Sequence, residues 1–128
     1  MKKKLLLVDD EDSILFAFEK ILSSPEVSVD TARDTHMALE RISSNTYHAV
    51  VADLRLTGVD DYDGLIIIKE LKKMQPRTKV ILITAYGGDE IKDLAFSVGT
   101  DFYLEKPVAP HQVKDLLSIM GIYHESSA

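Results

Sequence analysis

Short apolar runs, most of them unbroken, recur along this chain and are separated by longer segments with helical periodicity. The runs fall at roughly 5–8, 27–32, 48–52, 80–83 and 101–104. Parallel strands that are buried on both faces have such continuous runs, whereas strands with one wet face alternate apolar and polar residues. The pattern therefore predicts an α/β fold: a doubly wound, five-stranded parallel sheet with five helices covering both of its faces.

The segments between these runs carry apolar residues at the spacing of one helix face. After Gly88, apolar residues stand at i, i+3, i+4 and i+7, namely Ile91, Leu94, Ala95 and Val98. The segment from Val113 repeats this spacing and stops at Gly121, a residue type that commonly follows a helix C-terminus. The run at 27–32 alternates apolar and polar residues, which favours a strand at an edge of the sheet.

Composition limits the classes of protein open to this chain. Its 128 residues suit one domain, and a hydrophobic content of 45% is enough for a core. The absence of cysteine excludes disulfides and thiolate metal sites, and the net charge of −6 argues against binding nucleic acid or an anionic membrane. The first apolar stretch is shorter than the core of a secretion signal, about 7–15 residues. We therefore expect a cytoplasmic protein with one domain over 1–121 and a short C-terminal tail over 122–128.

Polar residues stand at the ends of four of the apolar runs. Asp9 and Asp10 follow the first run, Asp53 the third, Thr84 the fourth, and Lys106 stands two residues after the fifth. The carboxyl ends of parallel strands meet at one edge of an open α/β sheet, and ligands bind there. Carboxylates, a hydroxyl and an ammonium group would meet at this edge, which predicts a site for a divalent cation and a phosphoryl group.

These residue types suit phosphoryl transfer onto an aspartate. Clustered carboxylates repel one another unless a cation lies between them, and Mg²⁺ takes oxygen ligands and often bridges to phosphate. Asp53 ends a buried run and is the best-placed nucleophile for forming an acyl phosphate. Lys106 and Thr84 would stabilise charge on the phosphoryl oxygens. Each residue alone has an ordinary explanation in a turn or a helix cap, but their combination at successive strand ends is much harder to attribute to chance.

Four motifs in this arrangement resemble the signature of the receiver domain of two-component response regulators, of the chemotaxis-regulator type. They are Val8-Asp9-Asp10-Glu11, Val51-Ala52-Asp53-Leu54, Ile83-Thr84-Ala85 and Leu104-Glu105-Lys106-Pro107. The resemblance runs from Lys4 to Met120. It implies a flavodoxin-like receiver fold with strand order 2-1-3-4-5, and a cis peptide bond between Lys106 and Pro107.

The resemblance also implies a role for each site residue. Asp53 would be the phosphoacceptor, supplied by a sensor histidine kinase, a phosphotransfer protein or a small acyl phosphate. Mg²⁺, or Mn²⁺ in its place, would be bound by Asp53, directly by Asp10, mostly through water by Asp9, and by the backbone carbonyl of Arg55. Lys106 would pair first with Asp53 and then with its phosphoryl group.

Two residues would transmit phosphorylation to the surface. Thr84 would move toward the phosphoryl group and Tyr103 would turn inward, which would change the face made by the fourth helix, the fifth strand and the fifth helix. A downstream effector or a second copy of the chain would bind this face. Arg55 and Tyr86 would flank the path of the hydrolytic water. We hypothesise that the bulk of Tyr86 slows dephosphorylation; the alternative is that both are ordinary surface residues.

One segment departs from the receiver pattern. Thr57 stands where receivers usually carry a proline, and the loop over 57–63 is about three residues longer than usual. Its acidic residues partly match the spacing of a calcium-binding loop. The first position of such a loop would be Val59, however, so a solvated acidic loop is the better interpretation.

The resemblance implies a switch that catalyses only its own phosphorylation and dephosphorylation, and two alternatives stand beside it. A haloacid dehalogenase-type phosphohydrolase would need an aspartate where this chain has Arg55, and an acidic pair late in the chain. A degenerate receiver would act without phosphorylation, although every expected side chain is present. The chain is either a stand-alone receiver or part of a longer regulator, and its sequence names neither kinase nor output partner.

Overall fold

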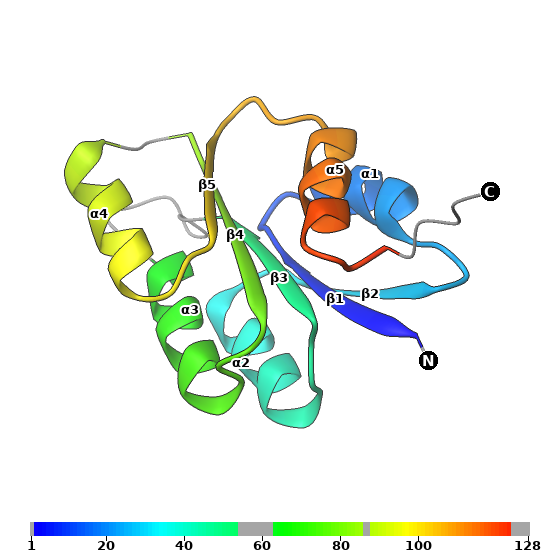
Figure 1. The fold of residues 1–128 in the computed structure, drawn as a ribbon, viewed down its shortest axis with the longest axis horizontal. Helices are drawn as coiled ribbons and strands as arrows, with labels where there is room; N and C mark the ends of the chain where they lie inside the picture. The colour runs from blue at the N-terminus through cyan, green and yellow to red at the C-terminus, as the bar shows by residue number, and fades with distance from the viewer. Residues whose placement is uncertain (1, 54–62, 86–87, 124–128) are drawn as a thin grey trace.

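A computed structural model of the chain describes residues 2–53, 63–85 and 88–123. In these residues, five strands alternate strictly with five helices (Figure 1). The elements are β1 (Lys3–Val8), α1 (Asp12–Leu22), β2 (Val27–Ala32), α2 (Thr35–Ser44), β3 (Ala49–Asp53), α3 (Asp63–Met74), β4 (Lys79–Thr84), α4 (Asp89–Ser97), β5 (Phe102–Glu105) and α5 (Pro110–Ile119). Their strands lie within two residues of the apolar runs, so the predicted alternation is confirmed.

The strands form one parallel sheet in the order β2-β1-β3-β4-β5. Every residue of β3 is buried, and so is every residue of β4 except the first. The four central residues of β2 are only half-buried. The strand order confirms the receiver topology. The half-buried residues of β2 confirm that the alternating run lies at an edge, because a strand tolerates polar residues in its interior only where one side faces solvent.

Successive side chains of the central strands point to opposite faces of the sheet and build two cores. Val50 and Leu82 pack with the residues of α2, α3 and α4, whereas Val51 and Ile81 pack with those of α1 and α5. Figure 1 shows the same division, with α1 and α5 on one side of the sheet and the other three helices on the opposite side. Covering both faces explains why these strands have no polar alternation.

Local signals set several helix ends. The Asp34 carboxylate accepts a hydrogen bond of 2.8 Å from the backbone N–H of Met37 and caps α2. Helix α5 begins with Pro110 and is followed by Gly121 at a φ of +85°, a conformation that favours glycine. None of the helices among the described residues is long and apolar enough to span a membrane.

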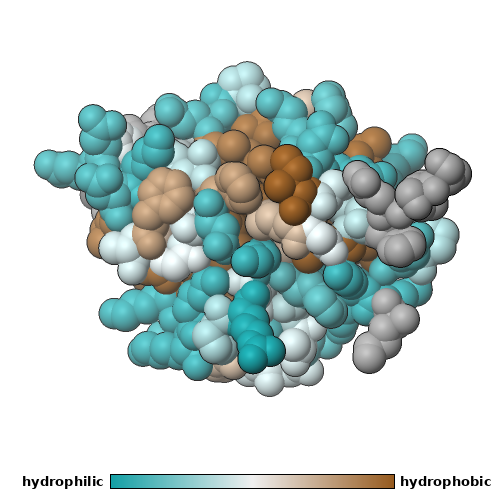
Figure 2. Space-filling model, viewed as in Figure 1, coloured by the Kyte–Doolittle hydropathy of each residue, from teal (hydrophilic) through white to brown (hydrophobic). Residues whose placement is uncertain are grey.

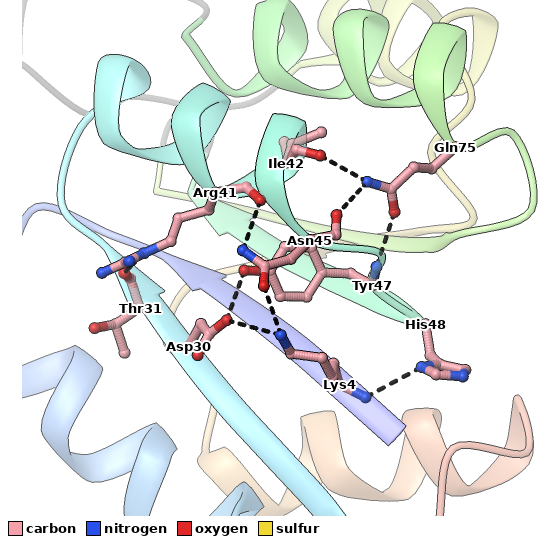
Figure 3. Close-up of polar contacts among 9 residues, drawn as sticks. All are labelled: Lys4, Asp30, Thr31, Arg41, Ile42, Asn45, Tyr47, His48 and Gln75. Atoms are coloured by element: carbon pink, nitrogen blue, oxygen red, sulfur yellow. Dashed lines mark hydrogen bonds and ion pairs between the residues drawn. The ribbon is translucent and has the colours of Figure 1, made fainter. Parts of the chain in front are cut away.

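Polar side chains tie the elements together at the amino-terminal edge of the sheet (Figure 3). The Lys4 ammonium donates to Asn45 Oδ1 at 2.7 Å, and the Tyr47 hydroxyl donates to Asp30 Oδ2 at 2.7 Å. The Gln75 amide bridges the end of α2 to the loop before β3, through hydrogen bonds of 2.7–2.9 Å. These contacts fix the strands at the edge opposite to the predicted site.

Candidate functional site

The predicted site residues meet at the carboxyl edge of the sheet. Asp9 follows β1, Asp53 ends β3, Thr84 ends β4 and Lys106 follows β5. The parallel register carries them there, since it aligns the last residues of neighbouring strands. Asp9 and Asp53 are only 7% and 8% exposed and Thr84 is fully buried, so polar groups are concentrated where solvent is scarce.

An ion pair joins the two sides of this cluster. The Lys106 ammonium donates a hydrogen bond of 2.9 Å to Asp53 Oδ2 and lies 3.7 Å from Asp9 Oδ2. The backbone N–H of Lys106 donates to the carbonyl of Thr84 at 2.8 Å, which anchors the lysine beside β4. Burial alone would lower the pKa of Lys106, but the hydrogen bond and charge of Asp53, with the charges of Asp9 and Glu11, raise it. The ammonium is therefore held charged.

The surroundings of Asp9 disfavour the ionised form of its carboxyl group. Burial raises its pKa to about 6, and the negative charges of Asp53 and Asp10 add to that shift. A hydrogen bond of 2.9 Å from the backbone N–H of Glu11 to Asp9 Oδ1, and the charge of Lys106, oppose it. A further cation at this position would stabilise the ionised cluster.

The carboxylates are arranged in a way that suits such a cation. Asp9, Asp10 and Asp53 each offer one oxygen, and these oxygens all lie within 4.8 Å of one another. Asp10 is exposed while the other two are buried, so the cluster opens to solvent on one side. An all-oxygen donor set of this kind fits a hard divalent cation that keeps some of its waters, as Mg²⁺ does.

Tyr103 lies on β5 and packs on the side of the sheet that α4 covers. Its ring packs at 6.5 Å, centroid to centroid, against that of Phe96, and its hydroxyl is buried without a hydrogen-bond partner among the described residues. Burial and the charge of Glu105 raise the pKa of the phenol, while the nearby backbone of Gly88, at a geometry short of a full hydrogen bond, partly opposes the shift. The Tyr103 side chain therefore points into the molecule here.

Some predicted features lie outside the described residues. Two features of the site that were not predicted are visible only in the structure. Arg55, Tyr86 and most of the unusual 57–63 loop are not described. The Lys106–Pro107 peptide bond is cis, as the resemblance implies. Sequence reasoning missed the hydrogen bond from the backbone N–H of Glu11 to Asp9, although aspartate side chains commonly accept from the backbone N–H two residues further along. It also missed an apolar cavity beside the cluster.

Comparison with known proteins gives this arrangement a family. The sequence model of the response regulator receiver domain matches residues 5–118. The chain belongs to this family. Receiver domains of response regulators are signalling switches that interact with histidine kinases and with effector domains. The match favours a receiver over a haloacid dehalogenase-type phosphohydrolase.

Relatives of known structure share the fold. A CheY-like receiver domain protein from Methanospirillum hungatei JF-1 superposes with a TM-score of 0.85 at 25% identity, over 94% of each chain. The BeF3-activated receiver domain of DrrB, a Thermotoga maritima protein, superposes with a TM-score of 0.83 at 28% identity, over 96% of this chain and all of the other. The flavodoxin-like receiver fold is thus confirmed.

Curated relatives are longer than this receiver domain. The alkaline phosphatase synthesis transcriptional regulatory protein PhoP of Bacillus subtilis is 31% identical over 113 residues, which are 88% of this chain and 46% of that protein. The response regulator protein PilR of Pseudomonas aeruginosa is 29% identical over 91% of this chain and 26% of its own length. The chain therefore spans less than half the length of these relatives.

Proposed function

We propose that this receiver domain takes a phosphoryl group onto Asp53 in a reaction that depends on Mg²⁺, or on Mn²⁺ in its place. The donor is a sensor histidine kinase, a phosphotransfer protein or a small acyl phosphate. The observation that carries the proposal is the ion pair of 2.9 Å between Lys106 and Asp53, inside a cluster of three carboxylates that suits a divalent cation. The nucleophile and its countercharge are thus already side by side.

The transfer step follows from the residues at this edge. An Asp53 carboxylate oxygen attacks phosphorus in line, a new P–O bond forms, and the bond from phosphorus to the donor's nitrogen or oxygen breaks with its electron pair leaving on the donor. The Lys106 ammonium then pairs with a phosphoryl oxygen, and the Thr84 hydroxyl donates to another. Asp9, Asp10, Asp53 and the carbonyl of Arg55 would hold the divalent cation, which would supply neutralising positive charge to the crowded oxygens.

The output of the switch is proposed to be the face made by α4, β5 and α5. Figure 2 looks onto this face and shows apolar side chains gathered over β5 and α5. Leu94 and Phe96 on α4 are 45% and 43% exposed, and Ile119 on α5 is 76% exposed. Apolar side chains that cluster at the surface are typical of interaction sites. Movement of Thr84 and Tyr103 would reshape this face for an effector protein or a second copy of the chain.

The remaining assignments belong to the same proposal. We assign no reaction to this domain beyond its own phosphorylation and dephosphorylation, whose rate Arg55 and Tyr86 would tune. We place it in the cytoplasm. Its net charge of −6 argues against direct binding to nucleic acid or to an anionic membrane. Residues 1–121 would form the receiver and 122–128 a short tail, in a stand-alone protein or in a longer regulator.

Intact-protein mass spectrometry tests the central step. The protein is incubated with acetyl phosphate and Mg²⁺, and we expect one phosphoryl adduct that disappears with EDTA and in Asp53→Asn. Asp115→Asn, which changes an exposed aspartate on α5, is the matched control and should retain the adduct. An adduct that persists in Asp53→Asn would place the acceptor elsewhere, and its absence from the wild type would favour the degenerate receiver.

A further inference from the structure

An apolar cavity of about 390 Å³ lies beside the carboxylate cluster. Its lining on the sheet side consists of Leu7 of β1, Val51 of β3 and Ile83 of β4. Its lining on the helix side includes Phe18 of α1 and Val108 of the β5–α5 loop. These residues belong to the core on the α1 and α5 side of the sheet. The cavity is thus a gap between that helical layer and the sheet, at the end of the sheet where the site lies.

The size and lining of this cavity suit a small ligand. Ligand pockets in proteins commonly measure about 300–1,000 Å³ and combine apolar walls with a few placed polar groups. Apolar cavities of smaller volume bind molecules such as benzene. Phosphoryl transfer uses only the polar edge of this cavity, so its apolar part has no role in the reaction proposed above.

The charged groups that line the cavity favour a ligand that carries a positive charge. They are the carboxylates of Asp9, Glu11 and Asp53, against the single ammonium of Lys106. Lys106 is hydrogen-bonded to Asp53, whereas Glu11 forms no ion pair with any described residue. An anion would meet an excess of negative charge here, and a cation would be attracted. The cavity therefore combines an apolar body with an acidic rim.

We propose that this cavity binds a small organic cation that carries a primary ammonium group on a compact apolar body. The apolar body lies between α1 and the sheet, against Phe18 and Val51. The ammonium group lies at the rim, against Glu11 and Asp9. Because Asp9 is also one of the clustered carboxylates, the ligand competes with a divalent cation. The ligand should therefore also inhibit phosphorylation. That inhibition rests on the proposed function, whereas binding of the ligand does not.

Binding of matched probes to the metal-free protein tests the proposal. We would titrate 2-phenylethylammonium, 2-phenylethanol and 3-phenylpropionate while recording amide chemical shifts by NMR. We expect saturable shifts at Leu7, Phe18 and Val108, with the ammonium probe binding at least about tenfold more tightly than the neutral one and the carboxylate binding most weakly. Added Mg²⁺ should raise the apparent Kd of the ammonium probe.

Two variants separate the apolar and charged halves of the site. Ile14→Trp adds bulk on α1 where Ile14 lines the cavity, and should abolish saturable binding. Glu11→Gln leaves the cavity open and should weaken only the ammonium probe, on the order of fivefold, as expected for one exposed ion pair. Thermal melting and Mg²⁺ binding check that each variant is folded.

Three results would overturn the proposal: equal affinity for all three probes, unchanged binding in folded Glu11→Gln, or no saturable shift in the wild type. If Ile14→Trp fails to fold, Glu11→Gln and the probe series still decide the question. The acetyl phosphate experiment contains no organic cation, so its outcome is independent. A phosphorylated protein without probe binding would refute the ligand site alone.

Discussion

Replacing Lys106 with methionine isolates the charge that balances the carboxylate cluster. Methionine keeps most of the apolar stem and removes the ammonium, which lies 2.9 Å from Asp53 and 3.7 Å from Asp9. Two unit charges about 4 Å apart attract by about 4 kcal/mol at an effective dielectric constant of about 20. Because the Lys106 side chain is 25% exposed, and because removing it also removes the cost of dehydrating the ammonium, we expect a net loss of about 2 kcal/mol in EDTA.

The same substitution should strengthen Mg²⁺ binding. In the wild type a divalent cation would share the carboxylates with Lys106, whereas in Lys106→Met it would have them alone. We expect an affinity for Mg²⁺ about tenfold higher, which corresponds to about 1.4 kcal/mol. A ligand that binds only the folded state stabilises it by an amount that grows with the ratio of its concentration to its Kd. In saturating Mg²⁺ the tighter binding by Lys106→Met therefore offsets about 1.4 kcal/mol of its loss, and the difference in unfolding free energy should shrink from about 2 to about 0.6 kcal/mol.

Urea unfolding in EDTA and in saturating Mg²⁺, with calorimetric titration of Mg²⁺, measures both quantities. Lys92→Met, which removes an exposed lysine from α4, is the control and should change neither. The reasoning is refuted if Lys106→Met is destabilised equally in EDTA and in Mg²⁺. That outcome would mean that Mg²⁺ does not replace the charge of Lys106 at the carboxylates.

Three further predictions rest on single residues. The folded-state pKa of Asp9 is raised from 3.8 to about 6. The folded protein therefore binds an extra proton between these pH values and loses stability as pH rises from about 4 to 6. Urea unfolding in EDTA should show Asp9→Asn more stable than the wild type at pH 7 by roughly 2 kcal/mol, and this gain should vanish near pH 4. His48 accepts a hydrogen bond of 3.1 Å from the backbone N–H of Lys4, and burial, with the charge of Lys3, lowers its pKa below 6.5. Its contribution is therefore present above pH 6.5 and is lost as pH falls through the folded-state pKa, so thermal melts of His48→Gln should show a weaker loss of stability below pH 6.5 than the wild type. Tyr103→Phe removes a buried hydroxyl that has no partner among the described residues, so urea unfolding should show it equal to or up to about 1 kcal/mol more stable than wild type.

Much of the fold could be predicted because its strands are buried on both faces. Burial of β3 and β4 requires continuous apolar runs, and Ala49–Asp53 and Lys79–Thr84 carry such runs. The edge position of β2 followed from its polar alternation, since one side of an edge strand is wet. The order of the remaining strands came from the resemblance, because apolar runs do not encode which strand lies next to which.

The polar half of the site could be predicted for a topological reason. Residues directly after parallel strands share one edge of the sheet whatever the intervening helices do, so Asp9, Asp53 and Lys106 had to converge. The pKa of Asp9 could not be predicted in this way. It depends on the burial of the carboxyl and on a hydrogen bond from the backbone of Glu11, and both are set by how α1 begins.

The cavity beside the site shows where pattern reasoning ends. Leu7, Val51 and Phe18 each resemble ordinary core residues in the sequence, and the structure places them in the core on the α1 and α5 side of the sheet. Whether such residues close on one another or leave a gap depends on side-chain volumes and on the tilt of α1, which periodicity does not contain. A polar rim on an apolar gap then arises because α1 begins directly after the acidic pair, which brings Glu11 and Phe18 to the same cavity. Features that depend on side-chain volume, rather than on the order of residues along the chain, therefore could not be predicted from the sequence.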